Sequence, residues 1–300
     1  MNNFNTIMVP ASSANLGSGF DVIGACLNVW NEISFRRSKF SIENIGHGAD
    51  TLNITKDNLI YKSFLHTTSI LGEKEIEVSL RCNNSIPTSG GLGSSSSAII
   101  AGILLAYSVH NVDLNHDDIF QIASDIEGHP DNVGPALYGG ITLGFKDLEK
   151  WFISNIKFDK NIKIVSFVSD QKILTSESRA ALPNTITRED AVYNITRSAL
   201  LVNSLNTNDF DLLKYAFQDK LHEQYRTPEI RGYSTISNAA MNAGAISSYL
   251  SGSGPTISAI TLGKELTINY EMLDAANKLD IPGIGIISSI STKGAYLLEK

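Results

Sequence analysis

The chain has 300 residues, which is enough for one large or two modest domains with a sizeable buried core. Lys and Arg total 24 and Asp and Glu total 31, so the net charge is −7, and this acidic balance argues against nucleic acid as a partner. No apolar run is long enough for a membrane span, the first residues do not resemble a signal peptide, and the two cysteines form no metal or disulfide pattern, so we expect a cytoplasmic protein with no membrane partner.

Helices and strands alternate through the first half of the sequence. The predicted elements are a helix over 58–71, a strand over 75–83, a helix over 94–110, a helix over 115–126, a loop over 129–140 and a strand over 141–145. Ile76, Val78, Leu80 and Cys82 alternate with polar residues, which is typical of a strand with one buried face. Asn115 predicts the start of its helix, because an asparagine side chain can cap the first turn.

The second half shows the same mixture. The predicted elements are a strand over 163–169, a helix from Thr187 to about 206, a helix over 235–243, strands over 245–250 and 257–260, a helix over 267–279 and strands after Pro282. Thr187 and Asp190 have the spacing of a capping box. Thoroughly mixed helices and strands predict an α+β fold, and we expect two lobes, residues 1–150 and 151–300.

A glycine- and serine-rich segment lies between the predicted strand over 75–83 and the helix over 94–110. It consists of Pro87, Thr88, Ser89, Gly90, Gly91, Leu92, Gly93, Ser94, Ser95, Ser96 and Ser97. Glycines allow positive φ and a close approach of the backbone, and the free N–H groups of the following helix attract anions. We therefore predict a nucleotide phosphate loop; the alternative is a flexible linker, which the flanking elements disfavour.

This phosphate loop differs from the two better-known phosphate motifs. No lysine follows Gly93, as the Walker sequence requires, and Ser96 stands where the protein-kinase loop has its third glycine. The positive charge for the phosphates must then come mainly from the helix terminus and a bound Mg²⁺.

Four segments resemble the GHMP kinases, the superfamily that includes galactokinase, homoserine kinase and mevalonate kinase. They are VPASSANLGSGFDVIGACL at Val9–Leu27, the phosphate loop, EGHPDNVGPALYGG at Glu127–Gly140 and LSGSGPTI at Leu250–Ile257. Together they are most similar to the homoserine kinases. The resemblance implies a ribosomal-protein-S5-like N-terminal lobe, a ferredoxin-like C-terminal lobe and an active site between them. It also implies ATP-dependent phosphorylation of the L-homoserine side-chain hydroxyl, a step of threonine biosynthesis.

The resemblance also assigns roles to single residues. Glu127 matches the family's magnesium ligand, and Ser95 would complete the protein's share of the shell; a lone helix-end glutamate is otherwise commonly just solvated. Asp21 suits the substrate ammonium group and Asn15 a hydrogen bond to the substrate. Both residue types also favour such loops for backbone reasons alone.

The substrate carboxylate calls for arginine, because a guanidinium can bind it through two hydrogen bonds. Arg179, four residues after Thr175, and Arg226 in HEQYRTPEIRGY both match the family pattern. In that segment Gln224 and Arg231 each replace a proline of the family, which leaves the choice between Arg226 and Arg231 open. A surface ion pair is the alternative role for any single arginine.

Three further residues are candidates. His129 and Asn132 in HPDN are expected to contact homoserine, although a lone histidine is more often structural. Some GHMP relatives have an aspartate base at the position of Asn132, and an amide cannot take a proton, which leaves the general base unidentified. Asn58 is expected either to face the adenine or to cap a helix. The turn SGSGPT approaches the phosphates or is purely structural.

Two other functions remain open at this point. A GHMP kinase could act on another small alcohol of the mevalonate or shikimate type, or a GHMP fold could sense a ligand without catalysis. The presence of Glu127 and the loop serines disfavours the second. Whether the chain forms a homodimer is also left open by the sequence.

Overall fold

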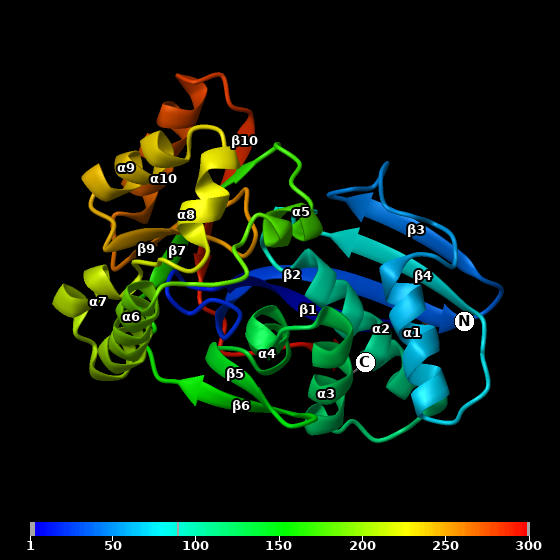
Figure 1. The fold of residues 1–300 in the computed structure, drawn as a ribbon. Coiled ribbons are helices and arrows are strands. Elements are labelled where there is room, and N and C mark those ends of the chain that lie inside the picture. Colours follow the sequence, from blue (N-terminus) through cyan, green and yellow to red (C-terminus); the bar gives the residue numbers. More distant parts are fainter. Residues whose placement is uncertain (1–3, 89, 299–300) are drawn as a thin grey trace.

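A computed structural model describes residues 4–88 and 90–298 as two β-sheets with helices packed against them (Figure 1). The first sheet has seven strands in the described residues: β1 (Asn5–Ala14), β2 (Ile23–Arg37), β3 (Ser41–Gly46), β4 (Val78–Asn84), β5 (Ile141–Asp147), β6 (Lys150–Ile156) and β11 (Tyr296–Leu298). Their order is β11-β1-β2-β4-β3, and β5 joins β6 to one end of β2. Every pair is antiparallel except β3 with β4, which is parallel.

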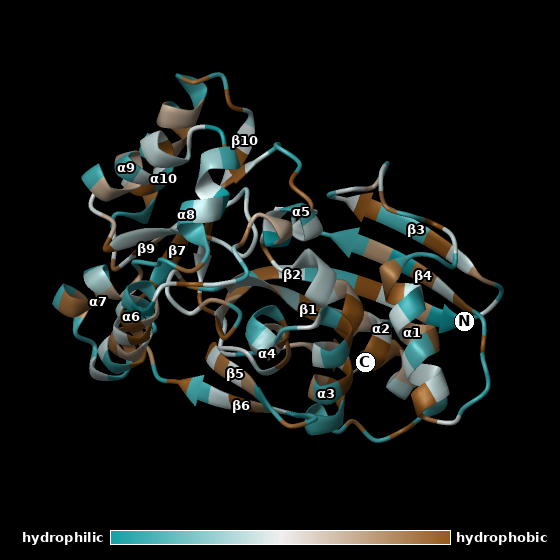
Figure 2. Cartoon of the chain, in the orientation of Figure 1, coloured by the Kyte–Doolittle hydropathy of each residue, from teal (hydrophilic) through white to brown (hydrophobic). Residues whose placement is uncertain are grey.

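Four helices cover this sheet. They are α1 (Leu59–Ile70), α2 (Ser94–His110), α3 (His116–Glu127) and α4 (Pro130–Tyr138). The helix α2 is apolar on nearly all sides because it lies between α1, α3 and the sheet, and Figure 2 shows much of it in the colour of hydrophobic residues. A cluster of buried side chains, which includes Phe64, Leu80 and Leu104, fills the space between sheet and helices.

The second sheet has the order β10-β7-β9-β8. Its strands are β7 (Lys163–Ser169), β8 (Ser247–Leu250), β9 (Ile257–Thr261) and β10 (Gly283–Ser289). The helices of this part are α5 (Thr175–Ala180), α6 (Arg188–Thr207), α7 (Phe210–Ala216), α8 (Glu223–Arg226), α9 (Tyr233–Asn242) and α10 (Glu265–Asn277). In the described chain, each helix is too short or too polar to cross a membrane.

The two sheets share a core. Ile23 and Leu27 from the first sheet pack in one cluster with Ile164 and Tyr249 from the second and Phe217 from the α7 end. Two strands beyond residue 149 also return to the first sheet, since β6 pairs with β5 and β11 pairs with β1. The lobes 1–150 and 151–300 stay a prediction, and this pairing favours a boundary after β6 rather than before it.

Most predicted elements occur close to their expected positions. The helix α2 begins and ends where it was predicted, Asn115 Oδ1 accepts the N–H groups of Asp117 and Asp118, and Thr187 caps α6 through Asp190 N–H. The strand predicted from residue 75 begins at Val78.

The predicted loop over 129–140 was wrong, because most of it forms α4. Its prolines and glycines suggested a loop. Pro130, however, occupies the first helical turn, where a missing N–H costs nothing. All of 130–137 is buried, so packing stabilises a helix that also contains Pro135.

Candidate active site

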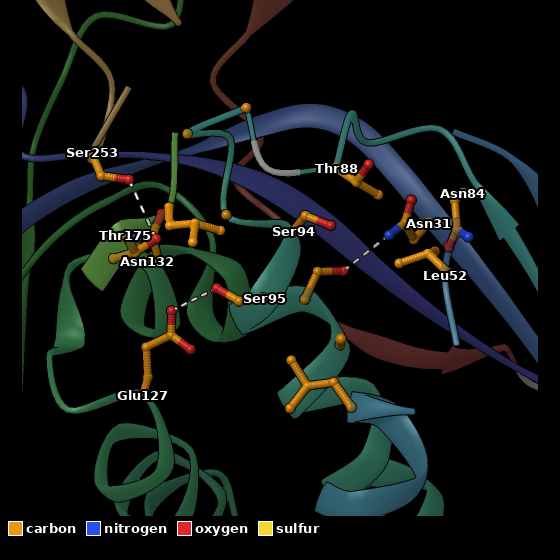
Figure 3. A pocket seen from close by; sticks show the side chains of 18 of the residues that line it. Asn31, Leu52, Asn84, Thr88, Ser94, Ser95, Glu127, Asn132, Thr175 and Ser253 are labelled. Atoms are coloured by element: carbon orange, nitrogen blue, oxygen red, sulfur yellow. Dashed lines mark hydrogen bonds between the residues drawn. The ribbon is translucent and has the colours of Figure 1, made fainter. Parts of the chain in front are cut away.

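One cavity of about 380 Å³ collects most of the predicted functional residues. Its wall includes Asn15, Asp21, Asn58, Thr88, Gly90, Gly91, Gly93, Ser94, Ser95, Ser97, Glu127, His129, Asn132, Thr175, Arg179 and Arg226. Figure 3 shows Ser94 and Thr88 between two ends of this cavity, with Thr175, Ser253 and Glu127 toward one end and Asn31, Asn84 and Leu52 toward the other. The phosphate loop thus borders the middle of this cavity.

The phosphate loop has the predicted link to a helix terminus. Gly93 is the N-cap of α2 with φ of 69°, and Gly91 has φ of 82°. A Cβ on Gly91 would lie 2.3 Å from the carbonyl oxygen of Ser251, whose own hydroxyl donates a 2.7 Å hydrogen bond to Gly91 O. The turn SGSGPT therefore packs directly beneath the loop, and glycine is required at position 91 for both conformation and space.

Four residues of the loop differ from the prediction or fall outside it. In the described structure Pro87, Leu92 and Ser96 are buried behind the cavity wall, and Leu92 belongs to the core shared by the two sheets. Ser89 lies outside the described residues.

The predicted magnesium ligands meet across the helices α2 and α3. Ser95 Oγ, in the first turn of α2, donates a 2.8 Å hydrogen bond to Glu127 Oε1 at the last residue of α3 (Figure 3). Both residues line the cavity beside the α2 terminus. A carboxylate and a hydroxyl are oxygen donors of the kind that Mg²⁺ prefers, so these residues fit the ion that the sequence predicts.

Asp21 and Arg179 bind each other. Arg179 donates through both terminal nitrogens to the two carboxylate oxygens of Asp21, at 2.8 and 3.0 Å. The backbone of Asp21 is held by Asn15, because the Asp21 N–H donates to Asn15 Oδ1. Asn15 Nδ2 in turn donates to Gly252 O at 2.8 Å. Asn15 thus joins the loop before β2 to the SGSGPT turn, and its amide is already engaged by backbone.

Arg226, rather than Arg231, lies in the cavity. The Arg226 guanidinium is buried, donates to the carbonyls of Ser178 and Gly252 at 3.3 Å each, and stacks on the Phe20 ring. Burial lowers the pKa of Arg226 from the usual arginine value. Because that usual value is so high, the guanidinium stays charged at neutral pH. Arg231 is exposed and lies away from the cavity wall, so the extra cation belongs to the surface.

His129 and Asn132 begin α4 and point into the cavity. Burial opposes a charge on His129, but the hydrogen bond and charge of Asp131, with Glu127 and Asp21 beyond, outweigh it and raise the pKa of His129 to about 9. Asn132 Oδ1 accepts a 2.8 Å hydrogen bond from Ser12 Oγ. A Cβ on Gly93 would collide with that hydroxyl, so the Ser12–Asn132 pair packs against the phosphate loop.

At the other end of the cavity, Asn58 serves as a helix cap. Its Oδ1 accepts Ile60 N–H and its Nδ2 donates to Asn53 O, so its amide holds the start of α1. Two asparagines that sequence reasoning missed lie nearby: Asn31, which bonds Ile86 N–H and the Ser97 hydroxyl, and Asn84, whose buried Nδ2 has no hydrogen-bond partner in the described chain. They sit on β2 and β4 without any local motif, so only the sheet pairing brings them to the site.

Ser253 lies in the turn SGSGPT but was not among the predicted site residues. Ser253 lines the cavity opposite α5, where its hydroxyl lies 3.4 Å from the Thr175 hydroxyl. The distance between these residues in the sequence hides this contact.

The fold and cavity together define a small-molecule kinase of the GHMP class. The family model for the N-terminal domain of GHMP kinases matches residues 58–140, from the start of α1 to the end of α4. A mevalonate kinase structure from L. major shares this fold, with a TM-score of 0.71 at 14% identity over 95% of this chain and 96% of that one.

More similar relatives indicate which GHMP kinase family the chain belongs to. The chain is 37% identical over 299 residues to the homoserine kinase of Clostridium beijerinckii, covering 98% of each protein, and 34% identical to that of Picosynechococcus, covering 97% and 98%. The homoserine kinase structure from Cytophaga hutchinsonii has a TM-score of 0.89 at 26% identity, over 99% of this chain and 98% of that one. The chain therefore belongs to the homoserine kinase family.

Proposed function

We propose that this enzyme transfers the γ-phosphoryl group of ATP to the side-chain hydroxyl of L-homoserine, giving O-phospho-L-homoserine for threonine biosynthesis. The carrying observation is that one cavity holds Asp21 together with Arg179 and Arg226 beside a phosphate loop. An α-amino acid carries an ammonium and a carboxylate on the same carbon atom. Asp21 supplies the opposite charge for the ammonium, and the arginines supply it for the carboxylate. An alcohol without an ammonium group would offer Asp21 no positive charge to bind.

The phosphate end of the site fits the same reaction. The α2 terminus and the glycines of the loop would hold the nucleotide phosphates by backbone N–H groups, and Glu127 with Ser95 would hold Mg²⁺. When bound, the ion supplies charge neutralisation to the phosphates. These residues make up for the lysine that the loop lacks.

Positioning supplies the catalysis at the hydroxyl. Asn132 carries an amide that cannot accept a proton, and its Oδ1 already accepts from Ser12. We infer that the side chains orient the hydroxyl for in-line attack and that the proton leaves to a phosphate oxygen. We also propose that the enzyme is located in the cytoplasm, as the sequence predicts.

A coupled assay of ADP release tests the proposal. We expect turnover with L-homoserine and far less with mevalonate or shikimate at equal concentration. Activity on mevalonate but not homoserine would favour another GHMP alcohol kinase, and Mg-ATP binding without turnover of any alcohol would favour a ligand sensor.

Two variants sharpen this assay. Glu127→Gln should collapse the rate, because the amide loses the charge that holds the ion. Arg226→Ala should lower kcat/KM for homoserine at least about a hundredfold, since buried charge-assisted bonds are lost, while KM for ATP stays near its original value. If Arg226→Ala weakened the use of homoserine and of ATP to the same extent, general misfolding would explain the result instead.

A further inference from the structure

His222 connects two loops of the site without reaching the cavity itself. It is fully buried at the N-cap of α8, one helical turn before Arg226. Its Nε2 lies 3.0 Å from the carbonyl oxygen of Gly17, and its Nδ1 lies 3.4 Å from Arg226 Nη1. The imidazole also stacks on the Phe20 ring, with 4.9 Å between centroids.

The backbone around His222 is fixed independently. Asp219 Oδ2 accepts the N–H groups of Leu221, His222 and Glu223 at 2.7 to 3.0 Å, which sets the entry into α8. The backbone of His222 is therefore held in place by bonds that do not involve its ring nitrogens.

Only one form of the imidazole satisfies both of these contacts. An arginine side chain offers donors and no acceptor, so Nδ1 must accept from Arg226. The proton then belongs on Nε2, where it is donated to Gly17 O. Burial, together with the Arg226 charge, lowers the pKa of His222, which agrees with a neutral ring.

We propose that His222, as the neutral Nε2–H tautomer, is a positioning residue that fixes the separation between Arg226 and the loop carrying Asn15 and Asp21. The inference rests on the proposed function, in which these two elements bind opposite charged ends of homoserine. The span between them decides whether the carboxylate and the ammonium of one α-amino acid can be bound together.

Phe20 extends the same connection. Its ring lies against both His222 and the Arg226 guanidinium, and it belongs to the loop that ends at Asp21. A shift of the imidazole would therefore move the arginine and the loop relative to each other. We expect this shift to weaken homoserine binding more than ATP binding, because both of the elements that move carry residues proposed to bind homoserine.

Three substitutions separate the two ring contacts. His222→Phe keeps the ring and its stacking on Phe20 but removes both hydrogen bonds. His222→Asn places an amide oxygen near the Nδ1 position, where it accepts from Arg226 and leaves Gly17 unpaired. His222→Gln carries an amide nitrogen toward Gly17 O and leaves Arg226 without its acceptor. His66→Gln, an exposed histidine on α1, is the matched control.

The measurements are KM for homoserine, KM for ATP, kcat and the thermal unfolding midpoint. For His222→Phe we expect KM for homoserine to rise about tenfold or more, because two buried hydrogen bonds are lost, with KM for ATP changed by less than about twofold. His222→Asn and His222→Gln should each recover part of the loss. In Arg226→Ala, adding His222→Phe should raise KM for homoserine by less than about threefold, since the group it positions is gone.

Several results would overturn the inference. One is an unchanged KM for homoserine in any folded variant of the three. Another is a parallel rise in both KM values with a lowered unfolding midpoint, which would make His222 purely structural. If His222→Phe does not fold, the Asn and Gln variants decide by the same criteria. An unmodified enzyme that does not turn over homoserine contradicts the proposed function instead, and this is measured first.

Discussion

Asp21 and Arg179 form an ion pair whose side chains remain 31% and 44% exposed. Solvent screens such a pair, so its contribution to folding is small, below about 1 kcal/mol. Its geometry matters more, because both groups face a cavity that we propose takes up a zwitterion. Each of the two groups neutralises the other, and a zwitterionic substrate can replace that pairing without adding net charge.

Asp21→Asn is expected to separate binding from stability. The free energy of unfolding should change by less than about 1 kcal/mol, while KM for homoserine should rise at least about tenfold because the ammonium loses its charged partner. Urea unfolding and steady-state kinetics measure the two effects. Asp57→Asn removes another exposed ion-pair carboxylate that lines the far end of the cavity, and it serves as the comparison. A large stability loss with unchanged KM would contradict this role.

Asn132→Asp tests whether this side chain lies near the reacting hydroxyl. An aspartate keeps the oxygen that accepts from Ser12 and adds a group that can take a proton. We expect kcat of the variant to fall at acid pH in a way that the unmodified enzyme does not show, because the new carboxyl becomes protonated there. A profile identical to that of the unmodified enzyme would count against a position near the hydroxyl.

We propose that ATP binding depends on the phosphate loop. Gly91 and Gly72 offer a matched pair of substitutions, one inside this loop and one outside it. Both have positive φ, but a Cβ on Gly91 collides with Ser251 O whereas one on Gly72 meets nothing within 4 Å. Gly72→Ala should therefore cost about 1 kcal/mol of stability and leave the kinetics unchanged. Gly91→Ala should also raise KM for ATP at least about tenfold, because the loop must move. Equal kinetics in the two variants would contradict a phosphate role for this backbone.

Element prediction succeeded where local signals are strong. The helix α2 follows from its glycines, its serine-rich first turn and its apolar run, and Asn115 and Thr187 fix the starts of α3 and α6. The strand β2 carries no comparable signal. Its first five residues are all buried, so the polar alternation that marks a strand is absent there.

The site was predictable as far as motifs reach. Ser95 and Glu127 were named from sequence and lie in hydrogen-bond contact. The choice between Arg226 and Arg231 needed the fold, because only burial separates two arginines five positions apart. Asn31 and Asn84 required the register of β2 and β4, which no local pattern encodes.

At the scale of the whole molecule, Glu223 links pH to stability. Glu223 is half-buried, and its carboxyl accepts Leu250 N–H at 2.7 Å and the Tyr233 hydroxyl at 3.2 Å. Burial, the largest influence, raises the pKa of Glu223 to about 8. The folded protein thus favours the protonated form more than the unfolded chain does, and stability falls as pH rises from about 4.5, the unfolded value, to about 8.

Glu223→Gln should remove this dependence. The amide keeps an oxygen for Leu250 N–H and cannot ionise, so its free energy of unfolding should fall less than that of the unmodified protein between pH 6 and 8, by at most about 1.4 kcal/mol per pH unit. Urea unfolding at several pH values measures the difference, and Glu229→Gln, an exposed neighbour, is the control. Parallel pH profiles for the unmodified protein and Glu223→Gln would contradict a buried titrating carboxyl at this position.

The pairing of β1 with β11 has a consequence for biosynthesis. Thr6 lies opposite Leu298, so β1 is completed by a strand that is synthesised almost three hundred residues after it. During that interval the nascent chain presents β1 with an open edge, of the kind that other strands can pair with. A ribosome-bound intermediate of this enzyme should therefore depend on chaperones that shield that edge, even though the finished protein leaves it covered.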